Sequence, residues 1–435
     1  MLLTGTNTPV QPLSKLVQDG IRHIIPHLKY KARDTKHILQ IIISLNNQWG
    51  NLGGIPNTAK QIACDVKKLY PSVENVDGVD ALSELLDKFP NPDGLPKELI
   101  MEALKICLEE NVCEFCGRFF KPNHGTAMGP CHACDYVDCF MNKLDEKLAE
   151  NMEAEDIEHT GFRIFRDDGW DILINPETDL PKFEQILQEL HPSIEWEIKD
   201  TTEENNHALE YLDLTITIEN GRLETDIYAK NIPIYVPKSS CHPPHVGKSI
   251  IKSTAYRLNT IISKDDILEK RKIEYSRYFY ASLYPPKMVN RVMDKLMGVK
   301  RDHENKLVRS EARENRENLI NRPRKNKKKP GKKVFPLVTT WEPRMPNLAS
   351  ILKENLPILH KNPLNLKLFP EDSIFPGFRK RKNLGEIICP TKPRRNKPPA
   401  RPPGGSRPCK SKVCQVHTNL CTTDSVKASY DESPT

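Results

Sequence analysis

The chain has 435 residues, with 37% hydrophobic and 28% charged residues, 36 prolines and a formal net charge of +7. This composition fits about two or three globular domains joined by irregular segments. It excludes a bundle of transmembrane helices, because no apolar run reaches the roughly 18 residues that span a bilayer. No secretory signal is recognisable, so we expect the 12 cysteines to be thiols or metal ligands in a reducing compartment.

The first part of the chain reads as helices followed by a strand and a turn. An apolar strand runs into Asp65 and turns through Tyr70-Pro71-Ser72, and residues 111–120 read as further strands. Asp34 is placed to cap a helix. Helical spacing of apolar residues predicts helices over residues 13–25, 34–43, 78–89 and 95–108.

Two adjacent acids stand between two runs with the period-two alternation of strands, residues 161–164 and 170–174. Because Asp-Asp-Gly is turn chemistry, Asp167 and Asp168 are predicted at the tip of a β-hairpin. Adjacent carboxylates repel each other, and a divalent cation relieves that repulsion. Mg²⁺ typically takes one or two carboxylates together with substrate phosphates. For such a pair taken alone, an exposed acidic turn is the alternative interpretation.

Residues 125–130, Gly-Thr-Ala-Met-Gly-Pro, form a small-residue turn before a long helix over residues 131–150. The later elements are predicted as a helix at 180–190, a strand at 194–198, a hairpin of 211–218 with 222–229 across Asn220-Gly221, and helices within 248–300.

Positive charge is concentrated in two stretches, residues 322–333 and 392–401. Such blocks suit phosphate backbones or nuclear import, and a solvated linker is the alternative. From Pro390 onward Pro, Lys, Arg, Ser and Thr dominate, which predicts disorder.

A strand ending in Asp65, a glycine-containing turn at residues 125–130 and an acid pair at 167–168 occur in the order found in right-handed polymerase palms. There the acids converge on two metal ions that stabilise the attacking and leaving oxygens of an in-line displacement at phosphorus. Asp65 and Asp167 are the predicted main metal ligands and Asp168 a supporting one, and the backbone carbonyl of Val66 is a further candidate.

The ordered set of motifs resembles the reverse transcriptase of Penelope-like retroelements. Asp-Val-Lys-Lys-Leu-Tyr-Pro-Ser-Val (65–73), Gly-Thr-Ala-Met-Gly-Pro (125–130) and Phe-Arg-Asp-Asp (165–168) match its palm motifs. Weaker likenesses extend the resemblance over most of residues 4–425: Tyr-Leu-Asp-Leu-Thr-Ile (211–216), Ser-Ser-Cys-His-Pro-Pro-His (239–245) with Arg257, Leu-Val-Thr-Thr-Trp (337–341) and Phe-Arg-Lys-Arg-Lys-Asn-Leu (378–384).

The resemblance implies an α+β fold, in which a right-hand polymerase palm of an antiparallel sheet backed by helices is followed by a helical thumb and a partly disordered basic C-terminal region. It implies an RNA-directed DNA polymerase that uses Mg²⁺ or Mn²⁺, an RNA template, a DNA primer and deoxynucleoside triphosphates. It also implies a nuclear protein without a membrane anchor, and leaves the oligomeric state open. The expected domains are partial fingers at 1–58, a palm at 59–235, a helical thumb at 236–300, a basic linker at 301–334, a connector at 335–390 and a disordered basic Cys/His tail at 391–435.

By position, Tyr70 corresponds to the aromatic steric gate beside the incoming sugar, and a buried core tyrosine is the alternative. Gly125, Thr126 and Gly129 would shape the floor under the nascent base pair, or would simply form a helix entry. Lys230 is a candidate for contact with primer or pyrophosphate, where a solvated lysine is the alternative.

Two groups of cysteines have the spacing of zinc ligands. The pairs Cys113/Cys116 and Cys131/Cys134 flank the turn at residues 125–130, so zinc there would compete with the turn, and buried thiols are favoured. In the family, a Cys/His segment like that of the basic tail precedes a GIY-YIG endonuclease. Here it is a candidate zinc site or a disordered segment, formed by Cys409, Cys414, His417 and Cys421.

The family's fingers begin well upstream of Thr4 and supply basic residues to the triphosphate, and its nuclease follows the tail. Since clamping of the triphosphate is a large part of phosphoryl-transfer catalysis, we expect weak polymerase activity or none from this chain alone. Three hypotheses remain: a polymerase palm and thumb, a nucleic-acid-binding relic without catalysis, and a zinc-dependent scaffold.

Overall fold

The computed structural model describes residues 9–115, 118–121, 125–201, 208–297, 299–301, 307–309, 316–322, 335–342, 344–369, 373–379 and 381. The chain divides into two compact units between Glu224 and Thr225. We call the part up to Glu224 unit 1 and the part from Thr225 to Pro403 unit 2.

Unit 1 begins with helix α1 (Gln11–Ile21), a 3-10 turn η1 (Ile25–His27) and helix α2 (Thr35–Gly50). The Asp34 side chain caps α2 as predicted, because its Oδ1 accepts a hydrogen bond from the His37 amide at 2.9 Å. This cap satisfies one of the amides that a helix start leaves without a backbone partner.

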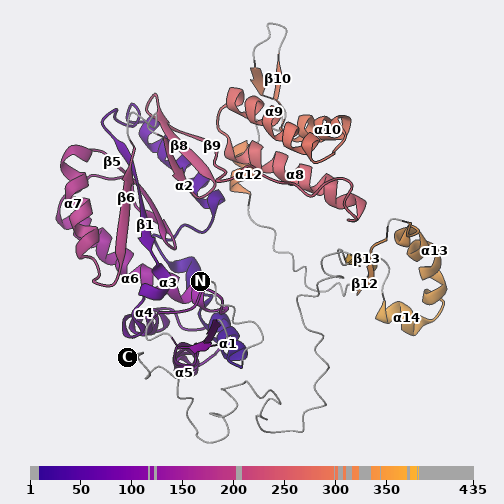
Figure 1. The fold of residues 1–435 in the computed structure, drawn as a ribbon, viewed down its shortest axis with the longest axis horizontal. Helices are drawn as coiled ribbons and strands as arrows, with labels where there is room; N and C mark the ends of the chain where they lie inside the picture. The colour runs from indigo at the N-terminus through magenta and orange to yellow at the C-terminus, as the bar shows by residue number, and fades with distance from the viewer. Residues whose placement is uncertain are drawn as a thin grey trace, which may run out of the picture. The chain divides into compact units, whose positions relative to one another are not determined.

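A four-stranded antiparallel sheet forms the centre of unit 1, with the order β4-β5-β1-β6 (Figure 1). Its strands are β1 (Lys60–Lys67), β4 (Arg163–Phe165), β5 (Asp168–Leu173) and β6 (Glu195–Asp200). The register places Asp65 of β1 opposite Asp168 of β5, and Cys64 opposite Gly169. This strand pair therefore brings together residues that lie far apart in the sequence.

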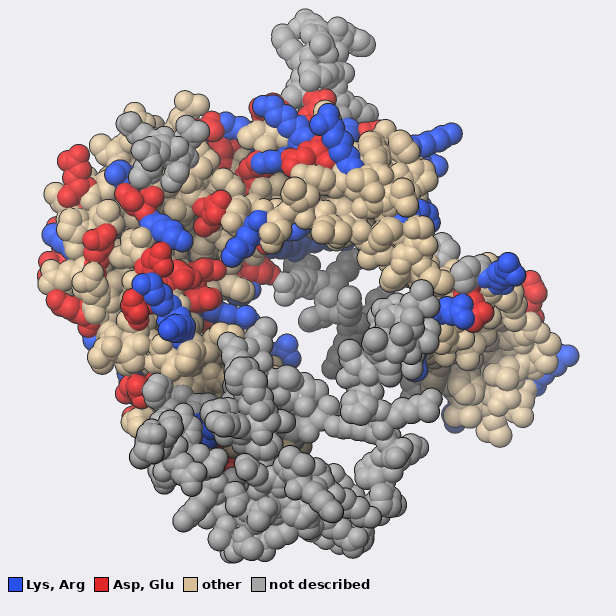
Figure 2. All heavy atoms as spheres, viewed as in Figure 1, with Lys and Arg blue, Asp and Glu red and all other residues tan. Residues whose placement is uncertain are grey.

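Helices cover one face of this sheet and bury the main hydrophobic core. From β1, the alternating side chains of Ile62, Cys64 and Val66 enter that core, as strand periodicity requires. The helices of unit 1 that follow β1 are α3 (Leu69–Ser72), α4 (Asn75–Lys88), α5 (Lys97–Glu109), α6 (Ala133–Ala154) and α7 (Pro176–Glu189). Figure 2 shows acidic and basic side chains interspersed over the visible described surface of unit 1.

The opposite face of the sheet is partly covered by the hairpin β7 (Ala208–Tyr211) and β8 (Leu214–Glu219). Gln61 of β1 donates to the Ile216 carbonyl at 3.0 Å, and Trp170 of β5 stacks on Tyr211 with ring centroids 6.0 Å apart. The hairpin therefore covers the part of this face that carries Gln61 and Trp170. Strand β9 (Arg222–Ile227) follows β8 in a three-stranded sheet and crosses the boundary between the units.

Unit 2 contains three successive helices, α8 (Pro244–Ile261), α9 (Asp265–Ala281) and α10 (Pro286–Met297), which pack against one another. Its β9 residues are tied to these helices, since Arg271 of α9 donates to Asp226 at 2.7 Å and the Thr225 hydroxyl donates to the Ile261 carbonyl at 2.6 Å.

The smaller elements are two short hairpins, a single short helix and a parallel strand pair with two intervening helices. They are β2 (Cys113–Phe115) with β3 (Arg118–Phe120), β10 (Val299–Arg301) with β11 (Leu307–Arg309), α12 (Arg316–Asn321), and β12 (Phe335–Thr340), α13 (Leu348–His360), α14 (Pro363–Leu368) and β13 (Ile374–Arg379). Among the described helices, none has both the length and the hydropathy to cross a membrane.

The predicted α+β class is confirmed at the level of antiparallel sheets with covering helices, and two local expectations were wrong. Asp168 does not lie in the hairpin turn but opens strand β5, so the tight turn consists of Arg166 and Asp167. The segment 211–218 is not one strand, because Leu212, with φ +54°, and Asp213 form the turn between β7 and β8.

Candidate active site

Asp65 and Asp168 lie side by side on the face of the sheet that the helices do not cover. They are direct partners in the antiparallel register of β1 and β5, and both are half-buried. Like charges placed directly opposite each other across two strands are destabilising. Two apolar side chains at these positions would be more stable than two carboxylates. A destabilising pair of this kind is typical of a functional site, so we take Asp65 and Asp168 as a candidate site.

Asp167 occupies the tight turn that precedes Asp168, and the backbone of β1 fixes it there. The Val66 amide donates to the Asp167 carbonyl at 2.9 Å. Arg166 adopts a left-handed conformation with φ +64°, which is uncommon for a residue with a long side chain. This turn holds three charged residues in succession beside Asp65.

The acids perturb one another electrostatically. Burial and the neighbouring Asp167 and Asp65, together with a hydrogen bond shared with Asp65, raise the pKa of Asp168 to about 6. Burial likewise raises the pKa of Asp167, as does Asp65, while Arg166 acts in the opposite direction. A proton on Asp168 therefore relieves the repulsion at low pH, and another positive charge is needed at higher pH.

The donor set suits a hard divalent cation. Mg²⁺ prefers carboxylate oxygens and is usually held by one or two carboxylates together with water and substrate phosphates. Asp65, Asp167 and Asp168 supply carboxylates from two adjacent strands and their turn. Within the described ranges, no group of three His, Cys, Asp or Glu side chains is already close enough to hold a metal ion.

Tyr70 follows β1 in the one-turn helix α3 and is only 8% exposed. It belongs to the hydrophobic core, and its hydroxyl lies 3.3 Å from the sulfur of Cys134 in α6. The structure therefore places Tyr70 among core side chains, the alternative that its position in the sequence left open.

The turn at residues 125–130 packs directly on the backbone after β1. The Thr126 amide donates to the Tyr70 carbonyl at 2.9 Å, and both Gly125 and Thr126 are buried. Gly125 has φ +78°, and a Cβ there would lie 2.6 Å from the Pro71 Cα. The two predicted motifs are thus in contact, whereas Gly129 lies exposed at the other end of the turn.

Several predicted residues lie away from this contact or outside the described part. Lys230 is exposed in unit 2. The tail residues Cys409, Cys414, His417 and Cys421 fall outside the described residues. Val66, in contrast, lies beside the acids, because its amide donates to the Asp167 carbonyl, and its side chain is buried.

Two features around the strands β4 and β5 were not predicted from the sequence. Gly169 has no room for a side chain, because a Cβ there would lie 2.3 Å from Cys64 Sγ. Lys31 forms an ion pair with the buried Asp138 of α6 at 2.5 Å, and both Lys31 and Arg166 stand over the ring of Phe165. The alternating pattern around Phe165 signals a strand but gives no sign of the distant Lys31.

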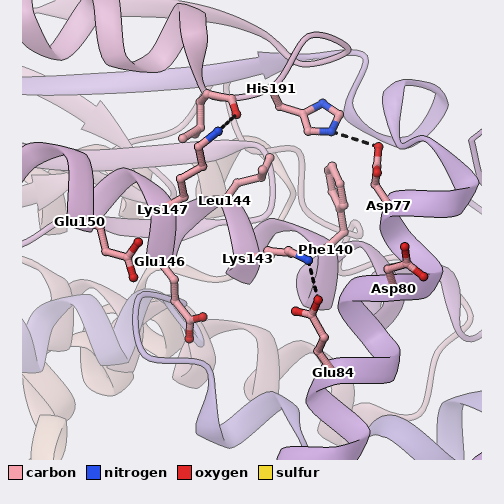
Figure 3. A pocket seen from close by; sticks show the side chains of 11 residues that line it. Asp77, Asp80, Glu84, Phe140, Lys143, Leu144, Glu146, Lys147, Glu150 and His191 are labelled. Carbon is pink, nitrogen blue, oxygen red and sulfur yellow. Dashed lines mark hydrogen bonds and ion pairs between the residues drawn. The ribbon is translucent and has the colours of Figure 1, made fainter.

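A separate cavity of about 400 Å³ lies between α4, α6 and the end of α7 (Figure 3). Much of its lining is paired, since Lys143 contacts Glu84 at 2.7 Å and His191 contacts Asp77 at 3.2 Å. It contains none of the predicted site residues, so the acid pair remains the candidate active site.

Comparisons with known proteins gave one family match and several similar solved structures. Residues 234–294, which contain α8, α9 and most of α10, match the family described as the animal helix-turn-helix domain. No curated protein sequence matches the chain.

Among solved structures, the chain is similar to an apo telomerase from Candida tropicalis truncated from its C-terminal domain, at 15% identity, with 51% of this chain and 46% of that chain covered and a TM-score of 0.40. A Candida albicans telomerase in complex with a fragment of telomeric RNA is 9% identical, with 65% and 47% covered and a TM-score of 0.45. The RNA-dependent RNA polymerase of bacteriophage phi12 is 12% identical, with 60% and 43% covered and a TM-score of 0.34. The chain spans about half the length of these telomerases.

A pH-dependent response to Mg²⁺ is expected from the raised pKa of Asp168. A carboxyl whose pKa rises on folding stabilises the fold below its unfolded pKa of 3.8, and this contribution is lost as the pH rises through about 6. A cation can replace the lost proton. We expect Mg²⁺ or Mn²⁺ to raise the Tm at pH 8 by about 2–4 °C and to have no effect at pH 5.

Differential scanning calorimetry with and without Mg²⁺ measures this shift. Asp168→Asn should raise the Tm at pH 8 without metal and should abolish the response to metal, because the repulsion is removed. An equal Mg²⁺ shift at both pH values would contradict the expected role of the acids.

Proposed function

We propose that the chain is an RNA-directed DNA polymerase of the retroelement type, with its nucleotidyl-transfer site at Asp65, Asp167 and Asp168. The observation that carries the proposal is the direct opposition of Asp65 and Asp168 in the β1–β5 register, with Asp167 in the adjoining turn. Support comes from the contact between the Gly125–Thr126 turn and the Tyr70 backbone, which joins a second predicted motif to the first.

The chain's own residues would divide the work as follows. Asp65, Asp167 and Asp168 would hold the catalytic cations, which when bound stabilise charge on the attacking and leaving oxygens. The hydrogen bond from the Val66 amide to the Asp167 carbonyl holds the turn against β1. Gly125 and Thr126 contact the backbone of Tyr70 and Pro71, just beyond β1, and would help to keep the acids preorganised.

The palm would correspond to the central sheet of unit 1 and the thumb to helices α8–α10 of unit 2. Helix α8 suits a phosphate backbone because it has no acidic residue, and no Asp or Glu occurs between Asp226 and Asp265. Lys248, Lys252 and Tyr256 recur at four-residue spacing on its exposed side. Basic side chains beside an aromatic one are typical of nucleic-acid surfaces.

Removing two of these charges should weaken nucleic-acid binding and its dependence on salt. For Lys248→Gln/Lys252→Gln, we expect the magnitude of the slope of log K against log salt concentration to fall by about 1.4–1.8, because each of the two lost phosphate contacts removes about 0.7–0.9. Fluorescence anisotropy with a labelled RNA–DNA hybrid over a salt series measures this slope.

Lys143→Gln is the matched control, since Glu84 already pairs with that lysine at 2.7 Å. The control should leave the slope unchanged. An equal effect of the control and the α8 variant would show that net charge alone, and not the α8 surface, sets the binding.

The competing function is a nucleic-acid-binding relic. It is favoured by the core position of Tyr70 and by the lack, among the described residues, of three side chains already close enough to hold a metal. Primer extension on an RNA template with Mg²⁺ or Mn²⁺ separates the two functions. Template-directed incorporation supports the polymerase, whereas folded protein that binds the primer–template without incorporation supports the relic.

A further inference from the structure

A pair of cysteines lies beside the candidate active site, and the proposed polymerase chemistry makes no use of it. Cys131 is exposed and Cys134 is half-buried, whereas Cys64, Cys107 and Cys139 are buried. Oxidants in solution therefore reach the first pair more easily than these three thiols.

Cys131 lies in the turn that precedes α6, and Cys134 lies in the first turn of that helix. The Ala133 amide donates to the Pro130 carbonyl at 3.3 Å and the Tyr136 amide to the His132 carbonyl at 2.9 Å, so this stretch already follows helical turns. Only two residues separate Cys131 from Cys134 at this helix start. A disulfide needs about 3.5–4.5 Å between the Cβ atoms, so its formation requires the turn to close to that distance.

The surroundings of Cys134 link it to the acids. Its sulfur lies 3.3 Å from the Tyr70 hydroxyl, and Tyr70 follows the strand that carries Asp65. Arg166, next to Asp167, interacts electrostatically with the same cysteine. Cys134 also lies in the first turn of α6, and the N-terminus of a helix attracts negative charge.

We propose that Cys131 and Cys134 are a modification site, which a hydroperoxide converts to a reversible intramolecular disulfide that switches the acid site off. The effect on the acid site rests on the proposed function, whereas formation of the disulfide does not. The Cys131 thiolate attacks one peroxide oxygen to give a sulfenic acid and hydroxide. The Cys134 thiol then attacks that sulfur and displaces water. In sum, two thiols and one hydrogen peroxide give one disulfide and two waters.

The disulfide would act on the site through Tyr70. Once its sulfur is bonded to Cys131, Cys134 no longer contacts the Tyr70 hydroxyl, and the first turn of α6 is drawn together. The Tyr70 carbonyl also holds the Thr126 amide, so the shift reaches the contact between both predicted motifs. Small displacements of a catalytic constellation cost large factors in rate, and we expect about tenfold slower primer extension.

The first measurement is peptide mapping by mass spectrometry of the full reduced chain after stoichiometric hydrogen peroxide. The expected product is a Cys131–Cys134 disulfide that dithiothreitol reverses and that Cys131→Ser abolishes. Cys241→Ser, which removes another exposed thiol, should leave the product unchanged. Pairing of either cysteine with a different one, or oxidation only to sulfinic acid, overturns the proposal.

The second measurement compares oxidised and reduced protein in primer extension and in the Mg²⁺-induced Tm shift at pH 8. Oxidation should reduce both in the wild-type chain, dithiothreitol should restore them, and Cys131→Ser should be insensitive to peroxide. If no form extends a primer, the polymerase proposal fails while the Tm shift still tests the switch. A disulfide that forms and changes neither readout overturns the switch.

Discussion

Any primer extension by the chain is expected to be abolished when Asp167 and Asp168 are both replaced by alanine, with a loss of at least about 10³-fold. Groups that stabilise charge on a transferring phosphoryl contribute losses of this size when removed. The double variant removes the turn acid and the strand acid and leaves only Asp65 on β1. Extension rates on an RNA template with Mg²⁺ measure the effect.

The fold should survive this change, which makes the result interpretable. Asp168 and Asp65 are like charges directly opposite each other, so removal of the Asp168 carboxylate removes a repulsion. We expect an unchanged or higher Tm without metal, the pattern of a site that trades stability for activity. Glu195→Ala is the control, because this exposed acid of the neighbouring strand β6 already pairs with Lys67 at 2.7 Å. Equal, measurable rates of primer extension by the double variant and the control would show that Asp167 and Asp168 are not needed for catalysis.

Local rules in the sequence were sufficient for several parts of this site. Asn220-Gly221 predicts the turn between β8 and β9, and both residues have positive φ. The strand before Asp65 follows from its apolar run, and α2 begins at the predicted Asp34 cap. In each case a few neighbouring residues determine the backbone.

The acid hairpin shows where local rules fail. Asp167-Asp168-Gly169 has the composition of a turn, but the turn lies one residue earlier and uses Arg166 in the left-handed conformation. Gly169 is required inside the strand, because Cys64 and Phe162 fill the space of a side chain. That requirement comes from residues across the sheet, so no local pattern could reveal it.

Contacts between residues far apart in the chain could not be predicted from the sequence either. The ion pair of Lys31 with Asp138 joins the segment before α2 to the middle of α6. The backbone beside it is also paired, since the Ala32 amide donates to the Ile164 carbonyl at 2.7 Å. Side-chain periodicity identifies which face of an element is buried, but not which distant residue covers it.

Substituting alanine for Gly125 should be the most destabilising single change near the site. The φ of +78° costs a residue with a Cβ about 1–2 kcal/mol. The added Cβ would also lie 2.6 Å from Pro71 Cα, 2.7 Å from Pro71 O and 2.8 Å from Tyr70 O. These are backbone atoms and cannot rotate away, so overpacking adds about 1–3 kcal/mol. We expect a loss of roughly 2–5 kcal/mol in the free energy of unfolding.

Urea denaturation of the full chain, monitored by circular dichroism, measures this loss. Gly50→Ala is the control. Gly50 ends α2, has no positive φ, and a Cβ there meets nothing within 4 Å. The control should therefore change the free energy of unfolding little. Similar free energies of unfolding for the two variants would show that the Gly125 turn does not depend on contact with the backbone after β1. This contact lies at Tyr70, three residues beyond the end of the strand that carries Asp65. We therefore expect Gly125→Ala also to reduce the Mg²⁺-induced rise in Tm at pH 8. The turn would then be a positioning element for the acids as well as a part of the fold.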